Sequence, residues 1–176
     1  MGMFDGVKDA KVAMDSTYIR PVHGILRIDR VKVGKSRKGR EFVAVEMTVV
    51  KVFDPFTEDG QPPHRPGEAV TDMKMSDNDY FLGEMKAFLA NTCDVQPEDV
   101  TPEDCELVTS DENPLGGVFV EVLARNRTTK EGKDFTKISY KRPVSPEELV
   151  DLVTEEEITK VFSTEAWEAV VAAASA

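Results

Sequence analysis

The sequence is poor in the residues that build disulfide frameworks and metal centres. It has two cysteines, Cys93 and Cys105, and two histidines, His23 and His64, among 176 residues. Two cysteines cannot make a disulfide framework, and with only these histidines to join them they cannot make a zinc site. We therefore expect no metal and no cofactor.

Long apolar runs are also missing. No stretch approaches the roughly 18 apolar residues of a membrane span, and residues 1–14 carry Asp5 and Asp9 where a signal peptide would be apolar. We expect a cytoplasmic protein without a membrane partner. Its 40% apolar and 31% charged residues are typical of one globular domain, because a chain of this length supports one core.

Recognisable catalytic motifs are absent too. There is no Gly-x-x-x-x-Gly-Lys phosphate loop, no Gly-x-Ser-x-Gly elbow and no histidine placed to support a nucleophile. The enzymatic alternative is a metal-dependent nuclease, since a Glu-x-Lys pair downstream of an Asp can hold Mg²⁺ and activate water. Such tripeptides occur at 84–86, within an expected helix, and at 131–133, at an expected hairpin tip. Chance produces them easily in so charged a chain, so we expect no enzyme.

The net charge of −11 hides an asymmetry. Segment 20–51 has nine basic and three acidic residues, and segment 118–143 has seven basic and three acidic residues, so the rest of the chain carries −21. A protein this acidic binds nucleic acid only through a localised patch, because the rest of its surface repels phosphate. Exposed strands also carry Lys for solubility and edge protection, but two matching segments favour one shared basic face.

Alternating apolar residues predict five strands. Residues 17–33 are rich in β-branched residues and lose their alternation at Gly24, which suits a long strand bent at a bulge. The clearest strand is 40–53, where Val43, Val45, Met47 and Val49 share one face. The other strands are expected at 68–75, at 118–125, and from a turn at 130–132 to about residue 140.

Helical spacing separates the third strand from the fourth. From Ser76 or Asp77, either of which can cap a helix, the spacing of Phe81, Met85, Phe88 and Leu89 predicts a helix that ends at Asn91. Residues 93–116 are acidic and contain proline, and we expect a connector with at most one helical turn. After Pro143, Ser145 precedes a proline at a first-turn position, so one or two C-terminal helices are predicted.

This order of elements is that of the OB-fold. The fold is mostly β with helices: a five-stranded Greek-key barrel with a helix between strands 3 and 4, followed here by a C-terminal helical extension. The alternative is any α+β meander of five strands. We divide the chain into an N-terminal arm (1–16), an OB-fold nucleic-acid-binding domain (17–143) and the C-terminal helical extension (144–176).

The two expected hairpin turns have similar sequences. Residues 37–42 and 130–135 both contain glycine, a base, an acid and phenylalanine in that order. Phe42 and Phe135 have the parity opposite to the apolar core positions, so both rings are expected to face solvent. Exposed rings beside Lys and Arg suit single-stranded nucleic acid, whose unstacked bases gain about 1 to 3 kcal/mol each on an aromatic ring. The alternative is that these rings pack under a loop or against the C-terminal helices.

In these hairpins, and over about residues 17–142, the chain resembles the OB-fold single-stranded DNA-binding proteins of bacteriophages. The resemblance implies coating of single strands, DNA or RNA, without strong sequence preference, during replication or recombination in the cytoplasm of a bacterial host. It implies that bases stack on Phe42 and Phe135. The basic residues of the candidate site are Lys35, Arg37, Lys38, Arg40, Arg125, Arg127, Lys130, Lys133 and Lys137.

The C-terminal part departs from that group and leaves a second hypothesis open. Such proteins often end in an acidic tail that recruits partners, whereas the acidic run 155–157 lies within a helical pattern. Trp167 with Val170 and Val171 would anchor a replication or recombination partner, or a second copy, if the chain is a protein-interaction module on an OB-like barrel. Such a module depends on apolar anchors, whereas nucleic-acid binding weakens steeply with salt.

Overall fold

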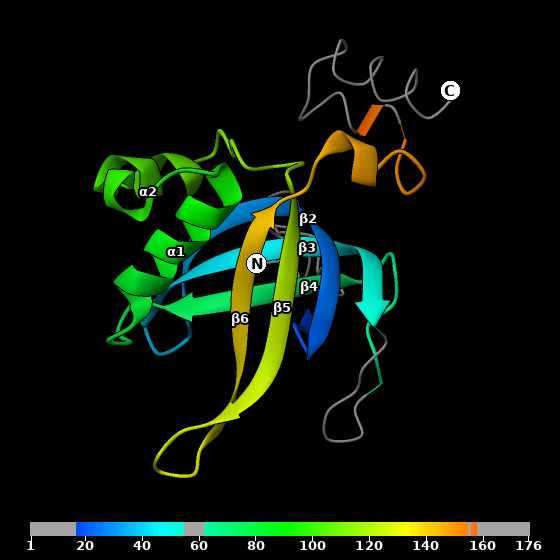
Figure 1. The fold of residues 1–176 in the computed structure, drawn as a ribbon. Helices are drawn as coiled ribbons and strands as arrows, with labels where there is room; N and C mark the ends of the chain where they lie inside the picture. Colours follow the sequence, from blue (N-terminus) through cyan, green and yellow to red (C-terminus); the bar gives the residue numbers. More distant parts are fainter. Residues whose placement is uncertain (1–16, 55–61, 155, 158–176) are drawn as a thin grey trace, which may run out of the picture.

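Six strands form one sheet in a computed structural model that describes residues 17–54, 62–154 and 156–157. The strands lie in the order β1-β4-β3-β2-β5-β6 (Figure 1). They are β1 (Thr17–Tyr18), β2 (Val22–Lys35), β3 (Glu41–Asp54), β4 (Ala69–Met75), β5 (Phe119–Thr128) and β6 (Asp134–Pro143). All neighbouring strands from β2 to β6 are antiparallel, and β1 adds to β4 in parallel. The prediction of five antiparallel strands is confirmed.

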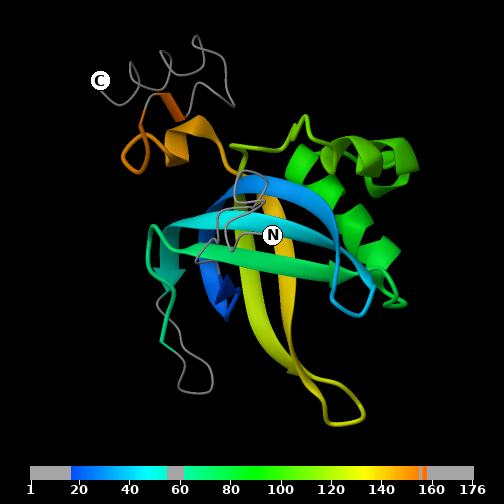
Figure 2. The ribbon, with the colours of Figure 1, turned by 180° about the vertical axis from the view of Figure 1, so that it is seen from behind.

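The long strand β2 belongs to both halves of the sheet. It pairs with β3 along its whole length and with β5 over residues 22–27, and β3 and β4 cross β5 and β6 steeply in both views (Figures 1 and 2). The ladder to β3 shifts register at three places, one of them between His23 and Gly24. A Cβ atom on Gly24 would lie 2.0 Å from the carbonyl oxygen of Lys51, so only glycine allows this close approach. The predicted irregularity at Gly24 is confirmed, although the extra residue is Phe53 of β3 rather than a residue of β2.

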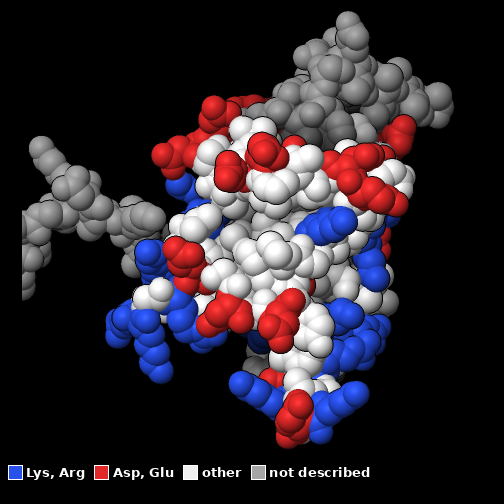
Figure 3. All heavy atoms as spheres, turned by 90° about the vertical axis from the view of Figure 1, so that its left-hand side faces the viewer, with Lys and Arg blue, Asp and Glu red and all other residues white. Residues whose placement is uncertain are grey.

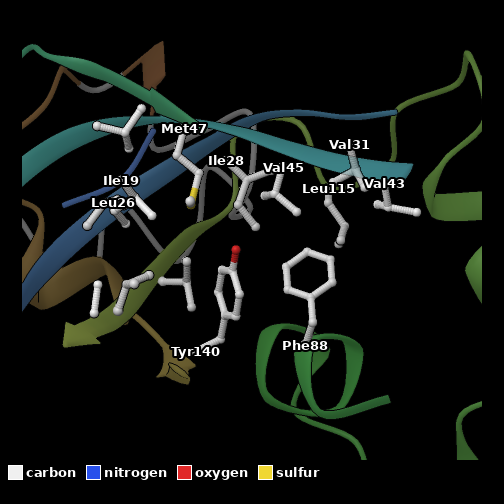
Figure 4. Close-up of a cluster of buried hydrophobic side chains, with 14 of the residues drawn as sticks. Ile19, Leu26, Ile28, Val31, Val43, Val45, Met47, Phe88, Leu115 and Tyr140 are labelled. Carbon is white, nitrogen blue, oxygen red and sulfur yellow. The ribbon is translucent and has the colours of Figure 1, made fainter. Parts of the chain in front are cut away.

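Helix α1 (Phe81–Cys93) follows β4 in the chain. It covers one end of the core. Its buried face carries Met85, Phe88 and Leu89, as the helical spacing predicts. These side chains pack beneath the apolar face of β2 and β3, which includes Val43, Val45, Met47 and Val49 (Figure 4). The Phe88 ring meets the Tyr140 ring edge to face, with centroids 4.6 Å apart.

A buried polar group links β6 to β4. The hydroxyl of Tyr140 donates to Oδ2 of Asp72 across 2.7 Å, and Nζ of Lys74 lies 2.8 Å from the same oxygen. All three side chains are buried. Tyr140 therefore joins two strands that are not neighbours in the sheet.

A buried histidine links the segment before β2 to the loop before β4. The backbone N–H of Arg20 donates to Nε2 of His64 across 2.9 Å, and Nδ1 of His64 lies 2.8 Å from Oε2 of Glu68. Because Nε2 accepts a hydrogen bond, it carries no proton, and the neutral ring donates from Nδ1 to the carboxylate. Burial lowers the pKa of His64 below its ordinary value.

The structure differs from the predictions at the helix starts. Helix α1 begins at Phe81 rather than at Ser76 or Asp77, because Asp77 instead binds an arginine of the β2–β3 turn. The connector contains more than one helical turn. It holds the 3₁₀ helix η1 (Pro97–Asp99) and the helix α2 (Pro102–Val108), which begins at a capping box formed by Thr101 and Asp104. The single-turn prediction was wrong because this cap went unrecognised.

In the described part of the C-terminal extension, residues 144–154 and 156–157, Ser145 caps only a short 3₁₀ helix, η2 (Pro146–Glu148), which gives way to turns at residues 149–153. The proline at the first-turn position is confirmed, but the prediction of a longer helix through these residues was wrong. Just outside η2, Val144 and Leu149 pack on Ile25 and Phe119. The predicted anchors Trp167, Val170 and Val171, and the N-terminal arm, lie outside the described residues. Both cysteines are free. No helix among the described residues is long and apolar enough to cross a membrane.

Candidate nucleic-acid interface

One face of the β5–β6 hairpin combines an exposed aromatic ring with basic side chains. In the ladder Arg125 lies opposite Lys137, and Arg127 lies opposite Phe135. These residues have the parity opposite to the buried Val122 and Ala124, so they point away from the core. Phe135 is 46% exposed. The strand parity therefore placed this ring correctly.

The turn of this hairpin adds two exposed lysines. Gly132 has a φ of 82°, and its N–H donates to the Thr129 carbonyl across 2.9 Å. The N–H of Thr129 donates to the Lys133 carbonyl across 2.8 Å, which closes the turn. Lys130 and Lys133 are both exposed. Because the hairpin projects beyond the rest of the molecule (Figure 1), these cations are accessible to an extended polyanion.

The turn between β2 and β3 presents a different arrangement of cations. Lys35 lies 3.6 Å from Glu41 in an exposed ion pair. Arg37 and Lys38 are exposed at the tip, and no carboxylate of the described part of the chain lies within ion-pair distance of either. Gly39, with a φ of 77°, closes the turn by donating from its N–H to the Ser36 carbonyl. Two of the four predicted cations at this turn are thus already paired.

The second paired cation is Arg40. Its Nε and Nη2 atoms donate to the two carboxylate oxygens of Asp77 across 2.6 and 2.8 Å. This hydrogen bonding raises the pKa of Arg40 and lowers the pKa of Asp77. Sequence analysis missed Asp77 as a member of the site. No local signal identifies it, because the contact depends on the turn before α1 meeting the β2–β3 turn in space.

Phe42 is half-buried on the outward face of the sheet. It lies opposite Gly34 on one side and Met75 on the other. Its ring covers Gly34 so closely that a Cβ there would lie 2.6 Å from the ring carbon Cζ. The parity prediction gave the correct face. The ring is nevertheless partly covered, because the missing side chain of Gly34 lets it lie against the strand.

The two aromatics are not brought together. Phe42 belongs to the β2–β3–β4 part of the sheet and Phe135 to the β5–β6 hairpin, and the two turns leave the body in different directions (Figures 1 and 2). Figure 3 shows Lys and Arg gathered over the lower part of one side of the molecule, at its edge and around the projecting hairpin. Asp and Glu cover the upper part and lie between these two basic groups.

A second feature of the surface is an apolar groove of about 380 Å³ between α1, α2 and the adjacent ends of β2 and β3. Val33, Leu82, Val100 and Cys105 are among the residues that line it. Leu82 is 77% exposed. The groove is separate from the β5–β6 hairpin, because no residue of that hairpin lines it.

Among the described residues, no group of three or more His, Cys, Asp or Glu side chains is placed to hold a metal ion. No protein-family model matches this sequence, and no curated protein matches it either.

Proposed function

We propose that this protein binds single-stranded DNA without strong sequence preference and without catalysis. The observation that carries the proposal is the outward face of the β5–β6 hairpin, where the exposed Phe135 lies opposite Arg127 and beside the Arg125–Lys137 pair. An aromatic ring offers a stacking surface to any base, and flanking cations follow the phosphates. Duplex DNA keeps its bases stacked inside, so this combination suits a single strand.

The sheet supports the same proposal. Five antiparallel strands with a helix after the third have the element order of the OB-fold, which binds oligonucleotides through a strand face and two hairpin loops. We assign the sheet to this barrel, with its closing seam between β4 and β6 bridged by the Tyr140–Asp72 hydrogen bond. The β2–β3 and β5–β6 hairpins then correspond to the two loops that flank the ligand.

In this mechanism Phe135, and Phe42 with the part of its ring that remains exposed, stack on bases. Phosphates are neutralised by the cations of the two hairpins other than Arg40, whose guanidinium is held by Asp77. If five to seven cations engage phosphates, log K falls against log salt with a slope of roughly −3.5 to −5, at about −0.7 per contact with a single strand. Such a protein coats exposed single strands during replication or recombination.

The test is fluorescence anisotropy of a labelled oligo-dT at several salt concentrations, with a duplex of equal length and an oligo-U as competitors. We expect tight, salt-sensitive binding that the duplex does not displace. The Lys130→Ala/Lys133→Ala double variant should weaken binding and lower the salt slope by about 1.4. Lys86→Ala, which removes an exposed lysine of α1, is the matched control. No binding at micromolar protein and low salt would overturn the proposal.

The apolar groove favours a second candidate function, a protein-interaction module. Its exposed Leu82 is an apolar anchor of the kind that partner proteins use. A module of this kind would lose its partner on Leu82→Asp and would respond weakly to salt. Single-strand binding should instead survive Leu82→Asp and weaken steeply as salt is added.

A further inference from the structure

A second aromatic group lies where β2 begins and β3 ends. The rings of His23 and Phe53 meet edge to face with centroids 5.0 Å apart, and Nζ of Lys51 lies 5.7 Å from the centroid of Phe53. Phe53 is 36% exposed. A ring with a cation beside it and one side open to solvent has the same chemistry as the Phe135 face of the β5–β6 hairpin.

Phe53 faces outward because of a β-bulge earlier in β3. Leu26 pairs with Val49 and Ile25 pairs with Lys51, so Val50 is an extra residue that shifts the alternation of the residues after it. Val52 packs against the main core, whereas the ring of Phe53 lies against His23. Simple alternation from Met47 and Val49 puts Phe53 on the core face, which explains why sequence analysis missed it.

The strand registers place this group on the same face as Phe135. His23 pairs with Leu123 of β5, and Arg127 pairs with Phe135 four residues farther along β5. Residues at even spacing in a strand point to the same side, so Leu123, Arg125 and Arg127 share the outward face. With about 3.3 Å per residue along a strand and about 4.8 Å between strands, His23 and Phe135 lie roughly 16 Å apart.

One carboxylate beside this position is neutralised by neighbouring groups. Oε1 of Glu121 lies 2.8 Å from Nε2 of His23. Its other oxygen lies 2.7 Å from Nε of Arg142. The hydrogen bond from His23 lowers the pKa of Glu121, with Arg142 adding to the effect. The carboxylate is therefore compensated, and it orients the imidazole that supports Phe53.

We infer that Phe53, supported by His23 and Lys51, is a second stacking position for the single-stranded nucleic acid that Phe135 binds. This inference rests on the proposed function. The ligand is an unstacked base, with its phosphate beside Lys51. Phe53 lies on β3, one strand farther from β6 than His23, so by the same spacings it lies roughly 20 Å from Phe135. At the 3.4 Å per nucleotide of a stacked strand, this separation corresponds to about six nucleotides, and to fewer in an extended strand. The two positions thus engage different bases of one oligonucleotide.

The first test uses the Phe53→Trp variant and a labelled dT20. The parent chain has one tryptophan, so its emission is subtracted from that of the variant. We expect the added emission to be quenched by dT20 and to saturate together with the anisotropy. Binding by anisotropy with unchanged added emission would overturn the inference and leave the proposed function standing. Absence of binding by anisotropy would overturn both.

The second test measures affinity against oligonucleotide length. The wild-type protein should gain affinity as oligo-dT grows long enough to reach both rings, whereas Phe53→Ala should lose that gain and bind dT20 at least about fivefold more weakly, from about 1 kcal/mol per stacked base. Phe53→Tyr keeps the ring and should bind as wild type. Leu82→Ala, which truncates an exposed apolar residue of α1, controls for lost surface. Equal affinity of wild type and Phe53→Ala at every length would refute the second position.

Discussion

The guanidinium of Arg40 donates two hydrogen bonds to the carboxylate of Asp77 and thereby joins the β2–β3 turn to the turn before α1. Arginine uses the same two-pronged geometry to bind phosphate. Asp77 therefore occupies the atoms that Arg40 would offer to a nucleic acid, whereas Arg37 and Lys38 at the same turn remain available.

Replacing Asp77 with Asn should strengthen binding of oligo-dT. The substitution removes a negative charge and frees Arg40, so the salt slope should become steeper by about 0.7, the value for one added phosphate contact. Both side chains are exposed, so thermal stability should barely change. Asp79→Asn is the matched control, because it removes the same charge from a neighbouring exposed residue. An equal gain in both variants would mean that Asp77 acts only through net charge.

Replacing Phe135 with Ala should separate binding from stability. We expect a loss of about 1 to 3 kcal/mol in oligo-dT binding, and a change in the free energy of unfolding within about 0.5 kcal/mol, because the ring is exposed. Anisotropy and urea denaturation measure the two quantities. Phe88→Ala should instead lower the free energy of unfolding by about 3 to 5 kcal/mol, since that ring is buried. A Phe135→Ala variant that unfolds would assign the ring to the core.

Phe42 should behave differently from Phe135, because its ring covers Gly34. Phe42→Ala should cost up to about 1 kcal/mol of stability, the scale of a cross-strand pair, as well as weakening oligo-dT binding. Gly34→Ala should destabilise the wild-type protein, where the new methyl meets the ring, more than it destabilises Phe42→Ala. Additive effects in this double-mutant cycle, measured by urea denaturation, would show that the ring and the glycine do not interact.

The stability of the protein should depend on pH through His64. Burial lowers the pKa of His64 in the folded state. At a pH below about 6.5, the ordinary pKa of histidine, the unfolded chain therefore binds a proton at His64 that the folded chain does not bind. The histidine therefore loses its stabilising contribution as pH falls from about 6.5 towards the lowered folded value. We expect the difference in unfolding free energy between wild type and His64→Gln to shrink between pH 7.5 and 5.5. His23→Gln is the control, and a difference that grows on acidification would contradict this role.

Tyr140→Phe should weaken the contact between β4 and β6. The substitution keeps the ring against Phe88 but leaves Asp72 without its hydroxyl donor. Loss of a partner by a buried carboxylate costs about 1 to 3 kcal/mol, which urea denaturation would detect. Tyr80→Phe removes an exposed hydroxyl and should leave stability unchanged. If both variants match wild type, the Tyr140 hydroxyl does not contribute to the fold.

Periodicity was enough to predict the succession of five strands and a helix along the chain, the buried face of α1 and the outward direction of Phe135. In each case the pattern extends over a regular element, so the direction of one side chain fixes the directions of its neighbours. The same reasoning failed at Phe53, because a bulge adds a residue to β3 and shifts the parity. It also failed at α2, where a capping box starts a helix in a segment that looked like a loop.

Contacts between distant segments were beyond the reach of the sequence. Asp77 is a residue type that often caps a helix, yet its carboxylate binds Arg40 of the preceding hairpin. The burial of His64 requires the backbone N–H of Arg20, which is 44 residues away in the chain. Nothing in the local pattern separates these partners from other exposed acids or histidines, because the pairing is decided by the packing of the whole sheet.

The register shifts between β2 and β3 have a consequence for the architecture of the proposed binding surface. Both hairpins are attached to the one strand β2, the first at its end and the second through its pairing with β5. The angle between the two hairpins is therefore set by how sharply β2 turns at its register shifts, one of which lies between Ile28 and Arg30. Deleting or inserting one residue there would swing one hairpin relative to the other and alter the path of a bound strand, although every contacting side chain would be retained.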